Sequence, residues 1–257
     1  MDYIVIGIVA FLASILTFFS GFGLGTILTP AFILFFPVDL SIALTGVVHF
    51  LNNLFKLYLV GMLADKSILI RFGIPAVLAA FLGAGLLLLL TDLPALFSYE
   101  FWGRTFEVSP LKFVISLLLV VFAFLDLIPK LHSLNIKSKH LPVGGMLSGF
   151  FGGISGHQGA LRSAFLIKAG LSKSTFIATS VVISSFIDFT RISVYATRFI
   201  SSGLQDNIPL LATSTLAAFS GAYLGSKLLK KVTLPFVQKL VAIMLLLIAV
   251  ALGLGWI

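Results

Sequence analysis

The chain has 257 residues, of which 59% are hydrophobic and 10% charged, and its mean hydropathy is +1.16. A soluble domain covers its exterior with charged side chains, so this composition excludes an ordinary soluble protein and predicts an all-α polytopic membrane protein. The net charge of +8 would favour nucleic-acid binding in a soluble protein. Here the basic residues cluster at the ends of apolar runs, where membrane topology and anionic lipid headgroups explain them, so no nucleic-acid partner is expected.

The sequence lacks the residues and motifs that several kinds of catalytic and metal-binding site require. It contains no cysteine, which excludes disulfides, thiolate metal sites and cysteine nucleophiles. It also contains no glycine-rich phosphate loop after a strand pattern, no HExxH motif, no paired carboxylates and no nucleophile motif. The sequence therefore predicts a protein that is not an enzyme and has no cofactor, no catalytic residue and no metal site.

Ten apolar segments follow one another, five on either side of a basic stretch. They are residues 3–20, 24–36, 41–62, 70–91 and 109–129, and then 142–155, 158–170, 174–199, 208–226 and 233–256. The second, sixth and seventh are too short to span a bilayer alone, because a spanning helix needs about 20 residues. The expected organisation is a first repeat at 1–129, a basic cytoplasmic linker at 130–141 and a second repeat at 142–257.

The two halves resemble each other when one is shifted along the other by 134 residues. The last segments coincide at a shift of 125, because the first half carries a longer loop at 91–109. The coincident features are Gly25 and Gly159, ALTGVV (43–48) and IATSVV (177–182), Pro75 and Pro209, and Pro110 and Pro235. This pattern predicts an internal duplication.

The distribution of Lys and Arg indicates how the halves are oriented. If each short segment returns to the side from which its predecessor came, as a re-entrant hairpin, each half then crosses an odd number of times and the halves are inverted. With the loop 130–140 inside, eleven basic residues lie on the inner side and three on the outer side. A rival topology fuses each short pair into one span, places the halves in parallel and removes this asymmetry. The positive-inside rule therefore favours inverted repeats with both termini outside.

Two glycine-rich breaks, SGFGLGTILTP (20–30) and SGHQGALRS (155–163), precede short segments. About 12 residues of helix follow each break, roughly half a bilayer core, so these helices are expected to begin near the midplane. Helix N-termini carry free N–H groups and positive potential, and two that meet from inverted repeats attract an anion. The substrate-binding residues expected here and on the next helix are Gly23, Gly25, His157, Gln158, Gly159, Arg162, Asn52 and His49.

The long segment after each short one carries a polar stripe at helical spacing. The stripes are Thr45, His49, Asn52 and Lys56 in the first half, and Ser180, Ser184, Asp188, Arg191 and Tyr195 in the second. Polar groups inside a membrane usually face the protein interior and serve function. We therefore hypothesise that Asp188, Arg191 and Lys56 act in coupling or gating, with His49, His157 and Asp188 as candidate proton carriers. Asp188 and Arg191, three residues apart, can instead neutralise each other.

Structural interpretations compete with these functional ones. The glycines can serve close helix packing alone. Arg162 and Lys56 can extend to the inner membrane interface, and His157 can satisfy a neighbouring carbonyl. Ser180 and Ser184 are expected to bond to the carbonyl of the preceding helical turn.

These features together resemble the TauE/SafE (TSUP) family of membrane proteins. A glycine-rich break leads into a short segment, then into a longer one that opens with small residues and Thr, and the whole is repeated. The motifs that carry the resemblance are GFGLGTILTPAFILFF, ALTGVV, GGISGHQGALRSAFL and IATSVV, and it covers nearly the whole chain. It implies transport of small sulfur-containing anions such as sulfite, sulfonates or thiosulfate. The GHQG of the second half departs from the more glycine-rich version common in the family, which leaves the substrate open.

The combined expectation is a secondary transporter in the plasma membrane that exports sulfite, an organosulfonate such as sulfoacetate, or thiosulfate by alternating access. Its expected partners are this small anion, coupled protons as a hypothesis, and the lipid bilayer, with the oligomeric state left open. An anion channel, or a transporter of another small organic anion, is the alternative. Inverted duplication favours alternating access over a continuous pore.

Overall fold

The computed structural model describes residues 2–20, 23–60, 63–127, 138–199, 205–228 and 234–257. The first half consists of α1 (Asp2–Ser20), α2 (Leu24–Ile33), α3 (Val38–Val60), α4 (Lys66–Ile68), the π-helical turn η1 (Leu69–Gly73), α5 (Ile74–Thr91), β1 (Phe97–Phe101), β2 (Arg104–Val108) and α6 (Pro110–Leu127). The second half consists of the 3-10 turn η2 (Ser138–His140), α8 (Leu141–Ser155), α9 (Gly159–Leu166), the 3-10 turn η3 (Ile167–Ala169), α10 (Lys173–Phe199), the 3-10 turn η4 (Gln205–Asn207), α11 (Ile208–Leu228) and α12 (Leu234–Gly253).

All ten apolar segments predicted from the sequence form helices. Within the described residues, four helices are long and apolar enough to cross a membrane: α3, the continuous helix Lys66–Thr91, α10 and α11. With 10 and 8 residues, α2 and α9 are too short to do so, as predicted. Most of the predicted linker at 130–141 lies outside the described residues, and its last part forms η2 and the start of α8.

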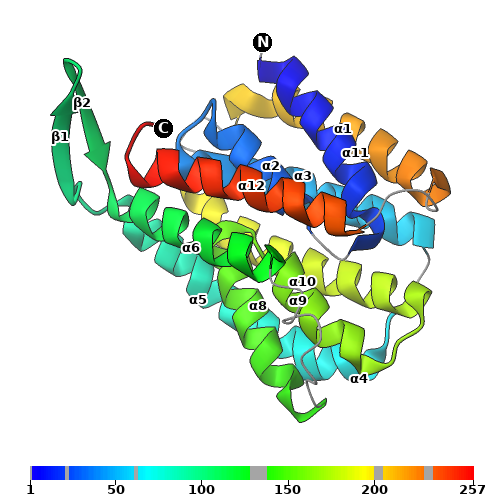
Figure 1. Cartoon of the computed structure of the whole chain (residues 1–257). Coiled ribbons are helices and arrows are strands. Elements are labelled where there is room, and N and C mark those ends of the chain that lie inside the picture. The colour runs from blue at the N-terminus through cyan, green and yellow to red at the C-terminus, as the bar shows by residue number, and fades with distance from the viewer. Residues whose placement is uncertain (1, 21–22, 61–62, 128–137, 200–204, 229–233) are drawn as a thin grey trace.

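The loop 91–109 contains a β-hairpin that the sequence analysis did not predict. β1 and β2 pair antiparallel and project beyond one end of the helix bundle (Figure 1). Trp102 and Gly103 make the turn with φ values of 52° and 70°, the two positive values of a type I′ turn. The hydroxyl of Tyr99 donates a hydrogen bond of 2.6 Å to the carbonyl of Leu254, just after α12. The hairpin is thereby tied to the end of α12.

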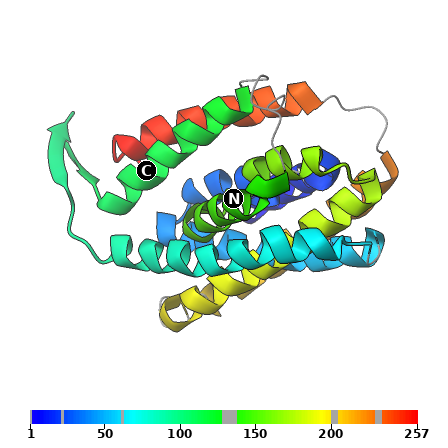
Figure 2. The ribbon, with the colours of Figure 1, turned by 90° about the horizontal axis from the view of Figure 1, so that it is seen from below.

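The helices pack in pairs that join the two halves of the chain. The most extensive contacts are between α5 and α8, α1 and α11, α6 and α12, and α3 and α10. Figure 2 shows α6 and α12 side by side, and in Figure 1 the end of α12 lies beside the start of α6 at the hairpin, so these helices are antiparallel. The same holds for α3 and α10, because Gly46 lies beside Arg191 whereas His49, further along α3, lies beside the earlier residue Asp188.

Glycines allow α8 to lie directly against α5. A Cβ added at Gly149 would come within 1.9 Å of the carbonyl oxygen of Ala76, and one at Gly153 within 2.4 Å of that of Ala80. Gly221 brings α11 equally close to the backbone of α1. Such contacts are typical of membrane helices that associate through small residues. Close helix packing is therefore a role of these glycines of α8 and α11, which lie outside the two breaks.

Replacing Gly149 with alanine tests this close packing. Gly149→Ala is expected to lower the free energy of unfolding by about 1 to 3 kcal/mol, because the added methyl group overlaps the α5 backbone and forces the helices apart. Gly85→Ala on α5 is the matched control, since its Cβ meets nothing within 4 Å. Thermal unfolding of both variants in the same detergent compares them, and equal midpoints would contradict the proposed contact.

Candidate functional site

The two glycine-rich breaks lie against each other in the interior. A Cβ added at Gly25, in the first turn of α2, would lie 3.2 Å from the carbonyl oxygen of Gly156, which ends α8. Gly156 has a φ of 79°, a left-handed conformation that favours glycine at the end of a helix. A Cβ added at Gly23, the N-cap of α2, would lie 3.2 Å from Nε2 of His49. The breaks before α2 and α9 therefore meet beside α3.

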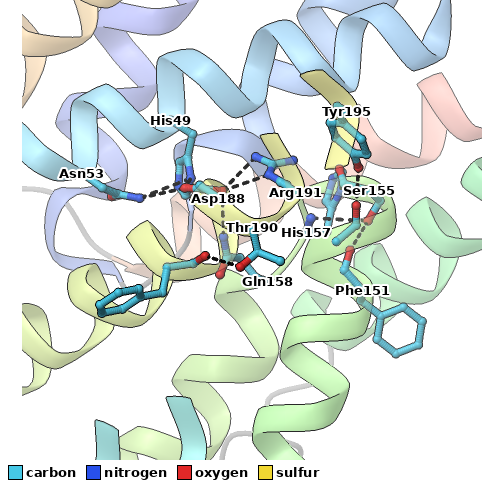
Figure 3. A network of polar contacts seen from close by, with 12 residues as sticks. His49, Asn53, Phe151, Ser155, His157, Gln158, Asp188, Thr190, Arg191 and Tyr195 are labelled. Carbon is cyan, nitrogen blue, oxygen red and sulfur yellow. Dashed lines mark hydrogen bonds and ion pairs between the residues drawn. The ribbon is translucent and has the colours of Figure 1, made fainter. Parts of the chain in front are cut away.

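Asp188 lies at the centre of a network of polar side chains (Figure 3). Nδ1 of His49 is 2.5 Å from Oδ2 of Asp188, and Asn53 donates to the same oxygen at 3.2 Å. Gln158 and Nε of Arg191 donate to Oδ1 at 3.2 and 3.0 Å. Asp188 is completely buried and is the only buried carboxylate in the described part of the chain. Arg191 forms an ion pair with it, as their spacing of three residues allows.

Arg191 fills the space beyond Asp188 along α10. A Cβ added at Gly46 would lie 3.3 Å from Cζ of Arg191, and one at Gly156 would lie 2.7 Å from its Nη1. The guanidinium is thus packed between α3 and the second break. One turn later, the hydroxyl of Tyr195 donates a hydrogen bond to the carbonyl of Gly153. Together these contacts join α10, α3 and α8 on this side of Asp188.

A cavity of about 20 Å³ lies on the other side of Asp188. Its polar lining includes His49, Asn53, Lys56, Arg162, Ser180 and Ser184. Nζ of Lys56 is 5.5 Å from the centre of the Phe18 ring, and Nη1 of Arg162 donates to Oε1 of Gln158 at 3.1 Å. Lys56 and Arg162 are each only 3% exposed, so neither side chain extends to the surface of the bundle.

The structure brings most of the predicted site residues into one region. Gly23, His49, Lys56 and Arg162 line the cavity, and Gln158 connects Arg162 to Asp188. Gly25 lies where the two breaks touch, and the buried Gly159 is the first residue of α9. The predicted grouping of the two breaks with the stripes on α3 and α10 therefore corresponds to a contiguous set of residues.

Two predicted residues point elsewhere. Asn52 accepts a hydrogen bond of 3.2 Å from Ser14 of α1 and does not line the cavity. The ring of His157 stacks on Phe122 with centroids 5.5 Å apart, and its Nδ1 is 3.1 Å from the carbonyl oxygen of Ser155. The interpretation of His157 as a residue that satisfies a nearby carbonyl is therefore the one that its contacts support.

Sequence reasoning missed Asn53 and misjudged Ser180. Asn53 lies four residues after His49 and hence on the same helical face, but the predicted polar stripe contains its neighbour Asn52 instead. Ser180 was expected to bond to the preceding turn, yet its buried Oγ has no hydrogen-bond partner among the described residues. It lies on the face of α10 that borders the cavity.

The chemistry of the cavity suits an oxyanion. Its lining contains an ammonium, a guanidinium, an amide, an imidazole and hydroxyls, each of which donates hydrogen bonds, and charged donors bind oxyanions most strongly. Within the described residues, no group of three or more His, Asp and Glu side chains is placed to hold a metal ion. The arrangement therefore has the donors that an anion requires.

A model of a known protein family matches nearly the entire chain. It is described as Sulfite exporter TauE/SafE and matches residues 6–252, a range that includes both breaks and every cavity-lining residue. Searches among curated proteins and among solved structures returned no match. The chain belongs to the Sulfite exporter TauE/SafE family.

Proposed function

We propose that this protein is a secondary transporter that exports small sulfur-containing anions, namely sulfite, a sulfonate such as sulfoacetate, or thiosulfate. Family membership makes it a membrane transporter. The observation that carries the proposal is the buried cavity in which Lys56 and Arg162 lie beside several hydrogen-bond donors, next to the meeting point of two broken helices. Charged residues inside a membrane usually mark the path of a substrate or ion.

An oxyanion would be held mainly by Arg162. Its planar guanidinium can bind two oxygens at once, while Lys56 adds a point charge and Asn53 an amide donor. The cavity, at about 20 Å³, has room for roughly one water molecule. A sulfur oxyanion is larger, so binding requires the flexible Lys56 side chain to move away from Phe18. We therefore expect the site to expand when it is occupied.

Substitutions at Arg162 test this binding role. Arg162→Ala should nearly abolish binding of thiosulfate, and Arg162→Lys should weaken it, because the charge is kept but the two-pronged contact is lost. Gln158→Ala removes a neutral partner and should cost about 0.5 to 1.5 kcal/mol. Calorimetric dissociation constants check these values, with the exposed Arg71→Ala as control. If Arg162→Ala folds and binds as tightly as the parent, the anion site lies elsewhere.

The pairing of helices supports inverted repeats at 1–129 and 142–257, joined by the linker 130–141. In the proposed repeats, α1 is equivalent to α8, α3 to α10, α5 to α11 and α6 to α12. Exchanging the halves therefore turns the pair α5 and α8 into the pair α11 and α1. The pairs α3 with α10 and α6 with α12 are each turned into themselves. A two-fold axis makes a helix antiparallel to its own equivalent when the axis is perpendicular to the helix. Both self-equivalent pairs are antiparallel, so an axis in the membrane plane accounts for them, and such an axis inverts the halves.

The grooves at the two ends of the bundle support re-entrant short helices. Residues 33–39, Thr91, residues near the start of α6 and Trp256 line one groove at the hairpin end. Val60, Lys173 and Ser226 line another groove. Fusing each short pair into one span would place the C-terminus and the loop 91–109 on opposite membrane faces. Re-entrant pairs α1 with α2 and α8 with α9 keep them together.

Cysteine labelling tests this topology. Single cysteines at the exposed Ser98 in the hairpin and the exposed Ser172 before α10 should react with an impermeant reagent from opposite faces, Ser98 outside and Ser172 inside. The chain has no other cysteine, so each signal is unambiguous. The parallel topology predicts that both cysteines are labelled from the same face, and that result would contradict the inverted-repeat topology.

The position of the cavity supports a carrier rather than a channel. Along α10 the cavity-lining Ser180 and Ser184 lie nearer to Lys173 than Asp188 does, and the positive-inside rule places Lys173 in the cytoplasm, with both termini outside. On the other side, Arg191 packs between Gly46 and Gly156. A site bounded on one side in this way favours alternating access over the channel. Counterflow of labelled anion in liposomes distinguishes the two, because only a carrier shows trans-stimulation.

We also propose that His49 couples transport to protons. Its Nδ1 faces Asp188, while its other side borders Gly23 and the cavity. Protonation of this ring would therefore change the electrostatic potential both at Asp188 and in the cavity. The other charged groups that act on His49 are Arg191 and Lys56.

Flux measurements under a pH gradient test the role of His49. In proteoliposomes, anion flux by the parent should change several-fold with the gradient, and His49→Asn should remove most of that dependence. His140→Asn, at an exposed histidine before α8, is the matched control and should behave as the parent. Flux that ignores the gradient in all three proteins would refute proton coupling.

A further inference from the structure

The buried charges of the site do not balance. Among the described residues, the buried Lys, Arg, Asp and Glu side chains are Lys56, Arg162, Arg191 and Asp188. Arg191 and Asp188 form an ion pair, with Nε 3.0 Å from Oδ1, so their charges cancel. Lys56 and Arg162 remain, and both line the cavity. With His49 neutral and all three bases protonated, the site has two more positive than negative charges.

Lys56 and Arg162 line the same small cavity, so positive charges on both side chains repel each other. Away from water such repulsion is strong, because the effective dielectric constant is low. Gln158, which accepts a hydrogen bond from Arg162 at 3.1 Å, is neutral and does not reduce the surplus. A ligand with two negative charges would compensate both cations. A monovalent anion would leave one buried charge uncompensated, which is costly.

We propose that the cavity selects divalent over monovalent anions and that Lys56 sets this preference, which rests on the anion-binding function proposed above. Arg162 supplies the two-pronged contact that any sulfonate-like group needs, whatever its total charge. Lys56 contacts the neutral ring of Phe18 and forms no ion pair with another described residue. A second negative charge on the ligand would therefore interact mainly with the ammonium group of Lys56.

The test compares ligands matched in shape but not in charge. Thiosulfate is paired with methanesulfonate, and sulfoacetate with isethionate, the first of each pair being divalent. Dissociation constants are measured by calorimetry on the full chain in detergent at one pH and ionic strength. The parent is expected to bind the divalent ligand of each pair about tenfold more tightly or better, a difference of about 1.4 kcal/mol.

Two substitutions assign the preference to a residue. Lys56→Met keeps the length of the side chain and removes its charge, so the ratio within each pair should fall to near one, mainly through weaker binding of the divalent ligand. Lys56→Gln serves the same purpose if the methionine variant does not fold. Lys66→Met, at an exposed lysine of α4, is the control and should keep the parental ratio.

Each outcome has a separate meaning. If the parent binds none of the four ligands, the proposed anion site itself is wrong. If the parent binds both charge classes equally, anion transport stands and selection for a divalent anion is overturned. If the ratio is unchanged in a folded Lys56 variant, the selection does not arise from Lys56.

Discussion

Side chains from three elements hold the carboxylate of Asp188, the one buried carboxylate among the described residues. His49 and Asn53 come from α3, Gln158 from the second break and Arg191 from α10. An ionised group at this depth is tolerated only when it is paired and hydrogen-bonded, so the four donors cannot be moved independently. His49 and Asn53 also line the cavity. A change at Asp188 therefore acts directly on two residues that line the proposed anion site.

Much of this arrangement was predictable, because the strongest constraints in a membrane are local ones. Apolar run length defined the helices, and the glycines with His157, Gln158 and Arg162 defined the second break. The wrong predictions concerned features that depend on how each helix is rotated about its axis and which helices it contacts. Periodicity allowed either Asn52 or its neighbour to face the cavity, and only packing against α1 excluded Asn52. The hairpin was missed despite the alternation of FSYEF, because its position between two long apolar runs was interpreted as a loop.

Burial also favours a different register for one pair of equivalent helices, α3 and α10, in the proposed repeats. Matching sequence motifs gave a shift of 134 residues. The exposed residues of α3 and α10 instead coincide at 135, as Leu54 does with Phe189 and Tyr58 with Ser193. The helices α5 and α11, which begin at Ile74 and Ile208, keep the shift of 134. A shift of one residue turns a helix by about 100°, so only one register can present the same face to the interior. Short runs of small apolar residues resemble one another too easily to distinguish the two.

In the register that burial favours, Asp188 corresponds to Asn53, and Arg191 corresponds to Lys56. On α10, the carboxylate neutralises the arginine three residues later. On α3, the equivalent position holds a neutral amide, so Lys56 has no such partner within its own helix. Under the proposed duplication the protein carries two related cations, of which Arg191 is paired with Asp188 and packed between Gly46 and Gly156. The other borders the cavity, and a bound anion would occupy the role on α3 that Asp188 has on α10. Under the proposed duplication, the carboxylate on α10 and the amide at the equivalent position of α3 are what distinguish the paired cation from the one that borders the cavity.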